Sequence, residues 1–271
     1  MSEILLEIDK LTVSFETDEG VFKAVDDVSF HVKKNEIVGL IGESGCGKSV
    51  IALSILRLIP SPSGRIENGQ IIFRGKDLLK LNIRKMKGIR GNAISIIFQE
   101  PSAALSPLHR IGQQIMESLS LHKNISKKTA WNISESWLEK VGISDAGERM
   151  FSYPYQLSGG MQQRVMIAMA LMLTPDLVIA DEPTTALDVT TQVQIFELIK
   201  ELKQSHTSIL LITHDIGIIW EMCDRVVVMY ASKIVEEGNV NDIFSKSAHP
   251  YTKALLKSVP KLSTDAGRLI P

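Results

Sequence analysis

Alternation of polar and apolar residues marks the N-terminal part of the chain. It runs through Leu6–Asp9 and Asp27–Val32 and returns at Gln70–Phe73. A period of two residues is typical of strands that bury one face and expose the other, most often in antiparallel sheets. We therefore predict an N-terminal antiparallel β-subdomain.

Apolar runs without alternation form a second kind of segment. These runs are Ile37–Ile41, Ile94–Phe98, Leu177–Ala180, Ile209–Ile212 and Val226–Met229. Strands that are covered by helices on both faces have this composition. The runs therefore predict a mainly parallel sheet in an α/β fold.

Helical spacing characterises the middle of the chain. Between Pro107 and Val141, apolar residues recur three or four positions apart. The same criterion predicts helices at Met161–Leu173 and Thr191–Lys203. The middle third is thus expected to be helical and to interrupt the strands on either side of it.

Composition and charge narrow the class of protein. The 271 residues are 44% hydrophobic and 23% charged, which is ordinary for a soluble globular protein. A net charge of −1 gives no overall field that favours nucleic acid or an anionic membrane. The apolar run Val165–Pro175 is too short to cross a bilayer, and Met1–Ile4 lacks the features of a secretory signal. Since Cys46 and Cys223 form no CxxC pair or disulfide framework, we expect a cytosolic protein.

The segment Gly42–Ser49, with the sequence Gly-Glu-Ser-Gly-Cys-Gly-Lys-Ser, has the pattern of a phosphate-binding loop. It lies between the predicted strand Ile37–Ile41 and a predicted helix at Val50–Leu56. Glycines let backbone N–H groups approach phosphate oxygens, and the helix N-terminus adds partial positive charge. We expect Lys48 to reach the β- and γ-phosphates and the Ser49 hydroxyl to bind Mg²⁺. The alternative is a glycine-rich turn with an incidental lysine, which the flanking strand and helix disfavour.

Two carboxylates follow the apolar run Leu177–Ala180. Asp181 stands at the end of this strand, where an acidic residue helps to hold the metal of a phosphate site. Glu182 comes next, and a second carboxylate beside anionic phosphates suggests a general base for the attacking water. The alternative role for Glu182 is to cap a turn before Pro183.

His214 follows another apolar strand, Ile209–Ile212, and precedes Asp215. Strand order places it at the same sheet edge as Asp181, where it could hydrogen-bond the γ-phosphate and orient water. Taken alone, it would be interpreted as an ordinary surface histidine.

A second anion-binding surface is predicted at Leu157–Arg164. Ser158 can cap the helix that starts near Met161, and Gly159 and Gly160 expose backbone N–H groups at its positive end. Because one nucleotide cannot easily occupy both surfaces of one monomer, this surface is expected to meet a nucleotide held by another copy or a paralogue. The alternative is a capped helix and nothing more.

Together these segments resemble the ATP-binding cassette (ABC) family over essentially the whole chain. Gly42–Ser49 resembles its Walker A loop, Leu157–Met161 its signature motif, and Leu177–Glu182 its Walker B strand with the catalytic glutamate. Three single residues also match: Gln99 the Q-loop, Asp188 the D-loop and His214 the switch histidine. The resemblance implies a P-loop NTPase fold with a RecA-like, mainly parallel core sheet, an N-terminal antiparallel β-subdomain and an inserted α-helical subdomain.

The resemblance also implies roles for individual residues. Glu182, His214 and Gln99 would be catalytic, and Ser49, Gln99 and Asp181 would bind Mg²⁺. ATP would contact Phe15, Gly42, Glu43, Ser44, Gly45, Cys46, Gly47, Lys48, Ser49, Val50, Ser158, Gly159, Gly160, Gln163 and Asp188. Phe15 occupies the position of the aromatic that stacks on adenine, but Phe22 competes for this role, and Phe15 could belong to the core.

The predicted domain division follows from these matches. Residues 1–245 form the nucleotide-binding domain, with the helical subdomain inserted at approximately 102–165. Residues 246–271 form a tail, in which Pro250 begins a short helix that ends near Val259.

Three segments narrow the subfamily. Phe98–Pro107, Tyr153–Gln156 and Ala248–Leu256 resemble the corresponding regions of oligopeptide, dipeptide and nickel importers. Ser106 stands where those importers often carry asparagine, and the sequence stops at Pro271 without the cysteine-bearing segment of many relatives. We therefore carry over no iron–sulfur site.

The implied function is that of the ATP-hydrolysing subunit of an ABC importer for peptides or a related solute such as nickel. ATP would be bound between two cassettes arranged head to tail, as a homodimer or a heterodimer with a paralogue. The implied partners are two transmembrane permeases and, through them, an extracytoplasmic solute-binding protein, with the chain peripheral at the cytoplasmic face of the membrane. Nucleic acid is not expected as a partner.

Three alternatives remain beside this function. They are a soluble ABC ATPase that acts on nucleic acid or ribosomes, an exporter cassette, and a cassette that binds ATP without hydrolysing it. The near-neutral charge disfavours the first, the His249–Tyr251 tail the second, and the presence of Glu182 and His214 the third.

Overall fold

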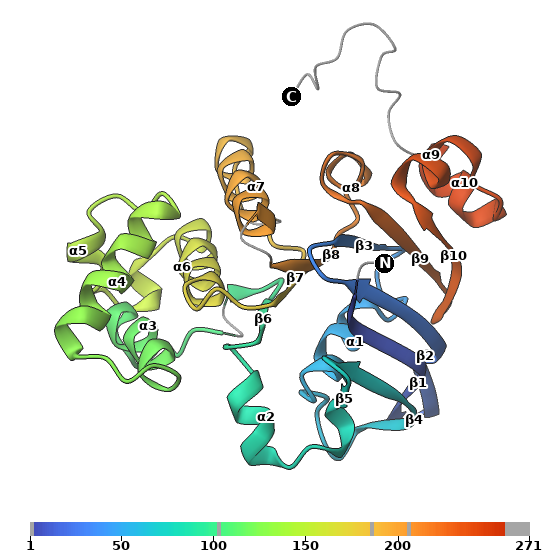
Figure 1. Ribbon diagram of the computed structural model, residues 1–271, viewed down its shortest axis with the longest axis horizontal. Coiled ribbons are helices and arrows are strands. Elements are labelled where there is room, and N and C mark those ends of the chain that lie inside the picture. The colour runs from blue at the N-terminus through green and yellow to red at the C-terminus, as the bar shows by residue number, and fades with distance from the viewer. Residues whose placement is uncertain (1–2, 102–103, 185–186, 205–206, 258–271) are drawn as a thin grey trace, which may run out of the picture. The chain divides into compact units, whose positions relative to one another are not determined.

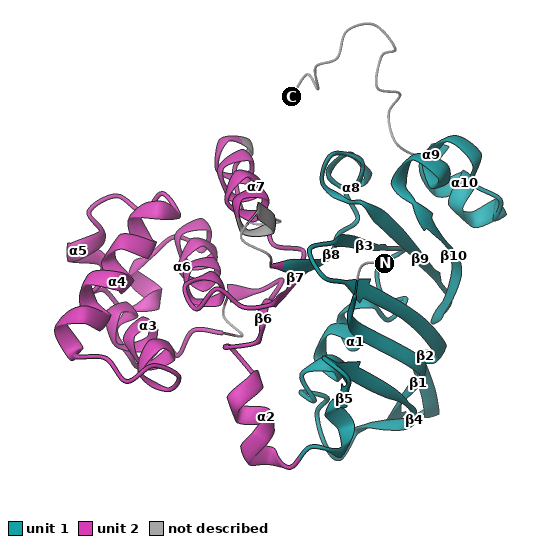
Figure 2. Cartoon of the chain, viewed as in Figure 1, with its two compact units in different colours: residues 1–81, 208–271 teal, residues 82–207 magenta. Residues whose placement is uncertain are grey.

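The computed structural model describes residues 3–101, 104–184, 187–204 and 207–257. The predicted helix end near Val259 and the tail to Pro271 lie outside these ranges, as do Ser102, Ala103 and Ala186 of the predicted motifs. The described chain forms two compact units, residues 1–81 with 208–271 and residues 82–207 (Figure 2). The predicted division at residue 245 stays a prediction.

Two groups of strands build the first unit (Figure 1). An antiparallel sheet of order β2-β1-β4-β5 contains β1 (Ile4–Thr17), β2 (Gly20–Lys33), β4 (Gly64–Phe73) and β5 (Lys76–Asp77). In the second group, β3 (Ile37–Ile41) pairs in parallel with β8 (Ser208–Ile212) and β9 (Arg225–Tyr230), and β10 (Lys233–Asn239) pairs antiparallel with β9. Both the antiparallel subdomain and the parallel pairing of the apolar runs are confirmed.

Burial explains why the two groups differ in sequence. All five residues of β3 and of β8 are buried, so neither strand alternates. In β4, only three of ten positions are buried, and this polar edge is why the sequence pattern predicted the strand from Gln70 instead of Gly64.

The helices of the first unit are short and follow its strands. They are α1 (Lys48–Ile55), the 3₁₀ turn η1 (Leu78–Lys80), α8 (Ile216–Met222), α9 (Val240–Lys246) and α10 (Pro250–Lys257). The expectation that helix α1 begins at Val50 was wrong by two residues, because Gly47 is its N-cap and Lys48 is already helical. Pro250 opens α10 as predicted.

The second unit combines two parallel strands with most of the longer helices. β6 (Ile94–Ile97) pairs in parallel with β7 (Leu177–Asp181). Its helical elements are α2 (Ile83–Ile89), α3 (Ile111–Ser120), α4 (Lys127–Lys140), α5 (Ala146–Arg149), η3 (Pro154–Gln156), α6 (Gly159–Leu171) and α7 (Val189–Gln204). The helices from α3 to α5 come between the two strands in sequence, as expected of an insertion. Within the described ranges, no helix combines the length and apolar character needed to cross a bilayer.

Candidate nucleotide site

The predicted phosphate loop joins β3 to α1, and two of its glycines are required by close backbone contacts. Gly42 has φ 154° and Gly47 has φ 108°. A Cβ atom at Gly42 would lie 2.2 Å from the carbonyl oxygen of Met229, and one at Gly47 would lie 2.2 Å from that of Ala24. Any side chain at these positions would therefore displace backbone of β9 or β2.

The side chain of Lys48 folds onto the backbone of this loop. Its side chain is 7% exposed, and its Nζ donates to the carbonyl oxygens of Gly42 and Glu43, each at 2.8 Å. The sulfur of Cys46 lies 3.8 Å from the same nitrogen. The ammonium group is therefore held at the start of α1, where a phosphate is also favoured by the helix dipole.

The other loop residues divide into exposed and buried positions. Glu43, Ser44, Gly45 and Ser49 are exposed, whereas Val50 is half-buried. The hydroxyl groups of Ser44 and Ser49 and the backbone at Gly45 are thus on the surface of the unit. This is the exposure that phosphate binding by backbone N–H groups and a serine hydroxyl requires.

A cavity of ≈ 510 Å³ adjoins the loop in the first unit. Its lining comes from the loop itself, from β2 and from the turn after β9, namely Phe22, Lys23, Asp26, Glu43, Ser44, Gly45, Cys46, Tyr230, Ala231 and Ser232. Phe22 is 54% exposed, while its cross-strand partner Phe15 is half-buried against Gly64. The geometry favours Phe22 as the aromatic neighbour of the loop, and which ring stacks on adenine stays a prediction.

In the second unit, the strand ends of β6 and β7 bring two predicted catalytic residues together. Asp181 ends β7 and is 6% exposed. Glu182 follows with φ 47°, a left-handed conformation that is uncommon outside glycine and tends to occur at functional sites. Its Oε2 accepts a hydrogen bond of 3.2 Å from Nε2 of Gln99, which follows β6.

The predicted signature segment is a capped helix N-terminus. Ser158 is the N-cap of α6, and its hydroxyl accepts a hydrogen bond of 3.3 Å from the N–H of Met161, so the predicted cap is confirmed. Ser158 and Gly159 are exposed and Gly160 is half-buried. The segment therefore presents a surface, with its polar groups at the positive end of a helix of 13 residues.

Gln163 does not share this surface. Its side chain is 0% exposed, and its Nε2 donates to the carbonyl oxygen of Pro183 at 2.8 Å. Here the amide links α6 to the loop after Glu182 instead of facing a nucleotide. Its position one helical turn from Gly159 was a poor indicator of exposure, because that face of α6 is buried.

Asp188 and His214 are both exposed, in the second and the first unit respectively. Asp188 accepts hydrogen bonds from the N–H of Thr191 at 3.0 Å and from its hydroxyl at 2.8 Å, and these bonds lower the pKa of the Asp188 carboxyl. His214 follows β8. The next residue, Asp215, caps α8 by accepting from the N–H groups of Gly217 and Ile218. The sequence prediction missed α8, although an aspartate before Gly217 is an N-cap signal.

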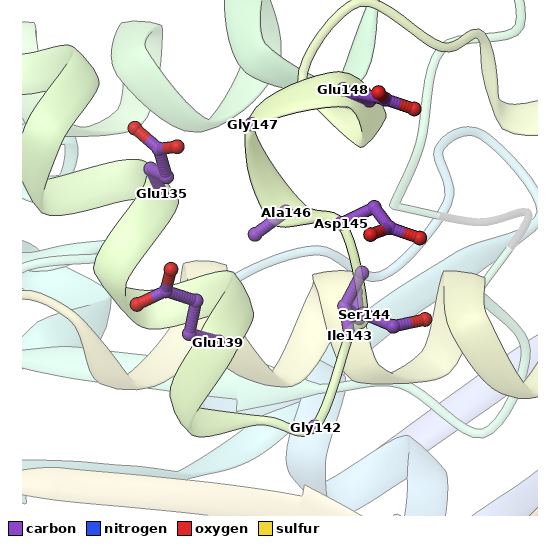
Figure 3. A pocket seen from close by; sticks show the side chains of 9 residues that line it. All are labelled: Glu135, Glu139, Gly142, Ile143, Ser144, Asp145, Ala146, Gly147 and Glu148. Atoms are coloured by element: carbon purple, nitrogen blue, oxygen red, sulfur yellow. The ribbon is translucent and has the colours of Figure 1, made fainter.

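A larger cavity of ≈ 630 Å³ lies in the helical part of the second unit. Figure 3 shows its carboxylates, which are Glu135 and Glu139 from α4, Asp145 at the N-cap of α5 and Glu148 within α5. Four carboxylates would repel a triphosphate, so this cavity is unsuited to ATP despite its size. The sequence prediction did not find it.

The predicted Mg²⁺ ligands have suitable chemistry. Ser49, Gln99 and Asp181 supply hydroxyl, amide and carboxylate oxygens, the donors that Mg²⁺ prefers. Across the described residues, no group of three or more His, Cys, Asp or Glu forms a metal cluster. A nucleotide-bound Mg²⁺ needs no such cluster, since one carboxylate and the phosphates commonly hold it.

A glycine-rich loop between a buried parallel strand and a helix, with an acidic residue ending a second parallel strand, defines a P-loop nucleotide-binding α/β protein. Residues 25–185 match the ABC transporter family, and residues 235–271 match the C-terminal region of oligopeptide/dipeptide transporters. The chain belongs to the ABC transporter family, whose cassettes are ATPases.

Curated relatives agree over nearly the full length. The chain is 51% identical over 270 residues to the dipeptide transport ATP-binding protein DppD of Bacillus subtilis, covering 99% of the chain and 81% of the relative. It is 49% identical over 260 residues to the probable peptide ABC transporter ATP-binding protein y4tR of Sinorhizobium fredii, covering 96% and 78%.

Solved structures agree on the fold. The dimeric post-hydrolysis structure of the ATP-binding cassette MJ0796, bound to ADP and Pi, matches with a TM-score of 0.79 and 26% identity, covering 87% of this chain and 99% of that one. An ATP-binding subunit of an ABC transporter matches with a TM-score of 0.72 and 26% identity, covering 88% and 91%.

Proposed function

We propose that this chain is the ATP-hydrolysing subunit of an importer for peptides or a related small solute. Support comes from the peptide-transport names of its relatives and from the match of residues 235–271 to the oligopeptide/dipeptide C-terminal region. The chain would act at the cytoplasmic face of the membrane with two permease subunits and a second cassette, and through the permeases with a solute-binding protein. Peptide is the favoured cargo, and nickel is the alternative.

The hydrogen bond between Gln99 and Glu182 is the observation that carries the catalytic part of the proposal. It joins Gln99, which follows β6, to Glu182, which directly follows Asp181 at the end of the parallel neighbour β7. In such a position Glu182 can take the proton of a water molecule whose oxygen attacks the γ-phosphorus, while the bond to the ADP oxygen breaks. His214 would hydrogen-bond the γ-phosphate.

Binding of the triphosphate falls to the phosphate loop. An ammonium group has three N–H donors, so Lys48 would keep its bond to the carbonyl oxygen of Gly42 while its other N–H groups bind β- and γ-phosphate oxygens, and the exposed loop N–H groups would surround the phosphates. Mg²⁺, when bound, neutralises charge on the phosphates, and Ser49, Asp181 and Gln99 would hold it.

The exposed segment Ser158–Gly160 would complete the site of a second cassette. Its support is the combination of a capped helix N-terminus with an open surface. MJ0796, the cassette of similar fold, is described as dimeric and bound to ADP and Pi. Whether the partner cassette is identical or paralogous decides only how many such sites are equivalent.

Glu182→Gln in the assembled transporter tests the proposal. We expect MgATP binding to persist and ATP turnover to fall about 10²- to 10⁴-fold, the range for loss of a general base. Glu197→Gln is the matched control, because this exposed α7 glutamate forms a surface ion pair with Lys200 at 3.1 Å. Turnover of Glu182→Gln within a few-fold of wild type would contradict the role.

Detergent extraction tests the assembly. Co-purification with permease subunits supports transport, whereas co-purification with ribosomes or DNA would favour a soluble ABC ATPase. Uptake of a labelled dipeptide and of nickel by vesicles that contain the assembly then separates the two cargo classes.

A further inference from the structure

The C-terminal helix α10 contacts the phosphate loop through one tyrosine. The hydroxyl oxygen of Tyr251, in the first turn of α10, accepts a hydrogen bond of 3.0 Å from the N–H of Glu43. The two residues are 208 positions apart and belong to the same compact unit (Figure 2). The segment that resembles peptide importers is thus bonded directly to the predicted nucleotide site.

The peptide unit that Tyr251 contacts is also the one that holds Lys48. The N–H of Glu43 and the carbonyl group of Gly42 belong to one planar amide, with the two groups pointing in opposite directions. The carbonyl oxygen of Gly42 accepts from Nζ of Lys48 at 2.8 Å. Tyr251 and Lys48 therefore form hydrogen bonds with the two ends of a single peptide group.

Gly42 adds no side-chain restraint on the rotation of this plane. Gly42 has no side chain and a φ of 154°, and it approaches the backbone of Met229 too closely for any substituent. A glycine peptide can turn more freely than others. An acceptor on its N–H side therefore decides where the carbonyl oxygen points and where Lys48 rests.

Tyr251 is itself held firmly. Its ring packs against Tyr230 with centroids 4.4 Å apart. Its own N–H donates to Nδ1 of His249 at 3.2 Å, and the carboxylate of Glu236 accepts from the N–H groups of Ala248 at 2.6 Å and His249 at 3.1 Å. Burial raises the pKa of the Tyr251 hydroxyl above its ordinary value of 10.0.

We propose that Tyr251 is a positioning residue of the ATPase, whose hydroxyl fixes the Gly42–Glu43 peptide and through it the resting place of Lys48. The inference rests on the proposed function of the loop in binding ATP. Glu236 supports it by holding the start of α10 in place. The C-terminal segment is then part of the nucleotide site, and its position sets the affinity of this cassette for ATP.

Tyr251→Phe tests the proposal because it removes the hydroxyl and keeps the ring pair. In the full chain, we expect the Kd for MgATP to rise about 3- to 10-fold, as for loss of one hydrogen bond. In the assembled transporter, KM for ATP should rise by the same factor, with kcat unchanged. Hydrogen exchange at the Glu43 amide should become faster before nucleotide is added.

Two further variants separate positioning from general damage. Tyr155→Phe removes the hydroxyl of an exposed tyrosine that also stacks on a second tyrosine, and it should leave the Kd unchanged. Glu236→Ala should raise the Kd as well, and adding Tyr251→Phe to it should raise the Kd by less than in wild type, since both act through one contact.

An unchanged Kd for Tyr251→Phe, with wild type binding MgATP normally, would overturn this inference and leave the proposed function intact. Additive effects of Glu236→Ala and Tyr251→Phe would overturn the shared route, as would a fall in kcat without a change in KM. Failure of wild type to bind MgATP would overturn the proposed function and this inference together.

Discussion

The phosphate loop and the N-terminus of α6 are two glycine-containing helix starts that are capped in different ways. Both bring glycines to the positive end of a helix. In the loop, Gly47 is the N-cap at φ 108°, and among the described residues no side chain caps α1. At α6, the hydroxyl of Ser158 caps the helix, and a Cβ at Gly159 would meet nothing within 4 Å.

Under the proposed function, this difference separates a loop that binds phosphate from a surface that completes the site of a partner cassette. The loop encloses its lysine and leaves the N–H groups of α1 available to an anion, so it can bind phosphate by itself. The α6 surface already satisfies one of its N–H groups and is open on the outside, so it can complete a site but cannot enclose one. A molecule with one of each is suited to work in pairs.

Matched substitutions of Gly47 and Gly159 should show the largest difference between the two helix N-termini. Gly47→Ala should reduce the free energy of unfolding by about 3 kcal/mol or more, because the new Cβ meets the Ala24 carbonyl oxygen at 2.2 Å in a left-handed conformation. ATP binding by the single chain should be lost. Gly159→Ala should leave the free energy of unfolding nearly unchanged and the single-chain Kd for ATP within about two-fold of wild type. It should slow only hydrolysis by the assembled pair.

Calorimetric ATP titration and denaturant unfolding of both variants measure this contrast. If Gly159→Ala weakened single-chain binding as much as Gly47→Ala, the two segments would not differ in the way described.

The same contrast shows what could be predicted from sequence. The buried strands β3, β7 and β8 were located within one residue, because runs without polar interruption have few alternative placements in an α/β fold. The start of α1 was missed because the loop glycine replaces the usual side-chain cap. Short α8 was missed because seven residues carry too little periodicity to detect.

For the site, residue types were predictable but contacts were not. Gln99 and Glu182 are 83 positions apart, and their hydrogen bond depends on β6 and β7 being neighbours. The contact of Tyr251 with Glu43 depends on the segment between α9 and α10 and on its hydrogen bonds to Glu236, neither of which leaves a local pattern. Burial of Gln163 likewise follows from packing of α6, not from its motif.

Lowering the pH should reduce the stability that Glu36 contributes at the start of β3, the strand before the phosphate loop. The cap of α6 is a neutral serine hydroxyl and should not respond. Glu36, directly before β3, bonds to the guanidinium of Arg225 at 2.9 Å and accepts from the N–H of Lys33 at 2.7 Å. Burial opposes ionisation of Glu36, but these bonds outweigh it and lower its pKa below the ordinary 4.5. The stabilisation is therefore complete above that ordinary pKa and is lost as the pH falls through the folded-state pKa.

His31 adds to the acid sensitivity in a higher pH range. Burial and nearby Arg225 lower its pKa below 6.5, so the folded state resists protonation and stability falls as the pH drops from 6.5. Glu36→Gln should lower the free energy of unfolding by about 2–3 kcal/mol at neutral pH, because Arg225 loses its buried partner. It should abolish the loss of stability below pH 4.5 and leave the loss that His31 causes at higher pH. Denaturant unfolding from pH 7 down through the folded-state pKa of Glu36, which lies below 4.5, checks this. If Glu36→Gln still lost stability below pH 4.5 as wild type does, the acid effect would belong to other groups.

Substitutions of Ser158 should have milder effects, and they separate two roles of its hydroxyl group. Ser158→Ala should lower the free energy of unfolding by about 1 kcal/mol through loss of the cap on the Met161 N–H, and it should slow hydrolysis by the assembled pair. Ser158→Asn restores a capping oxygen without the serine hydroxyl, so it should recover stability while hydrolysis stays slow. Hydrogen exchange in α6 and ATP turnover, measured on both variants, decide the matter. If asparagine restored both stability and hydrolysis, the Ser158 hydroxyl would act only as the cap of α6. The proposal that the α6 surface contacts the partner's nucleotide would then be contradicted.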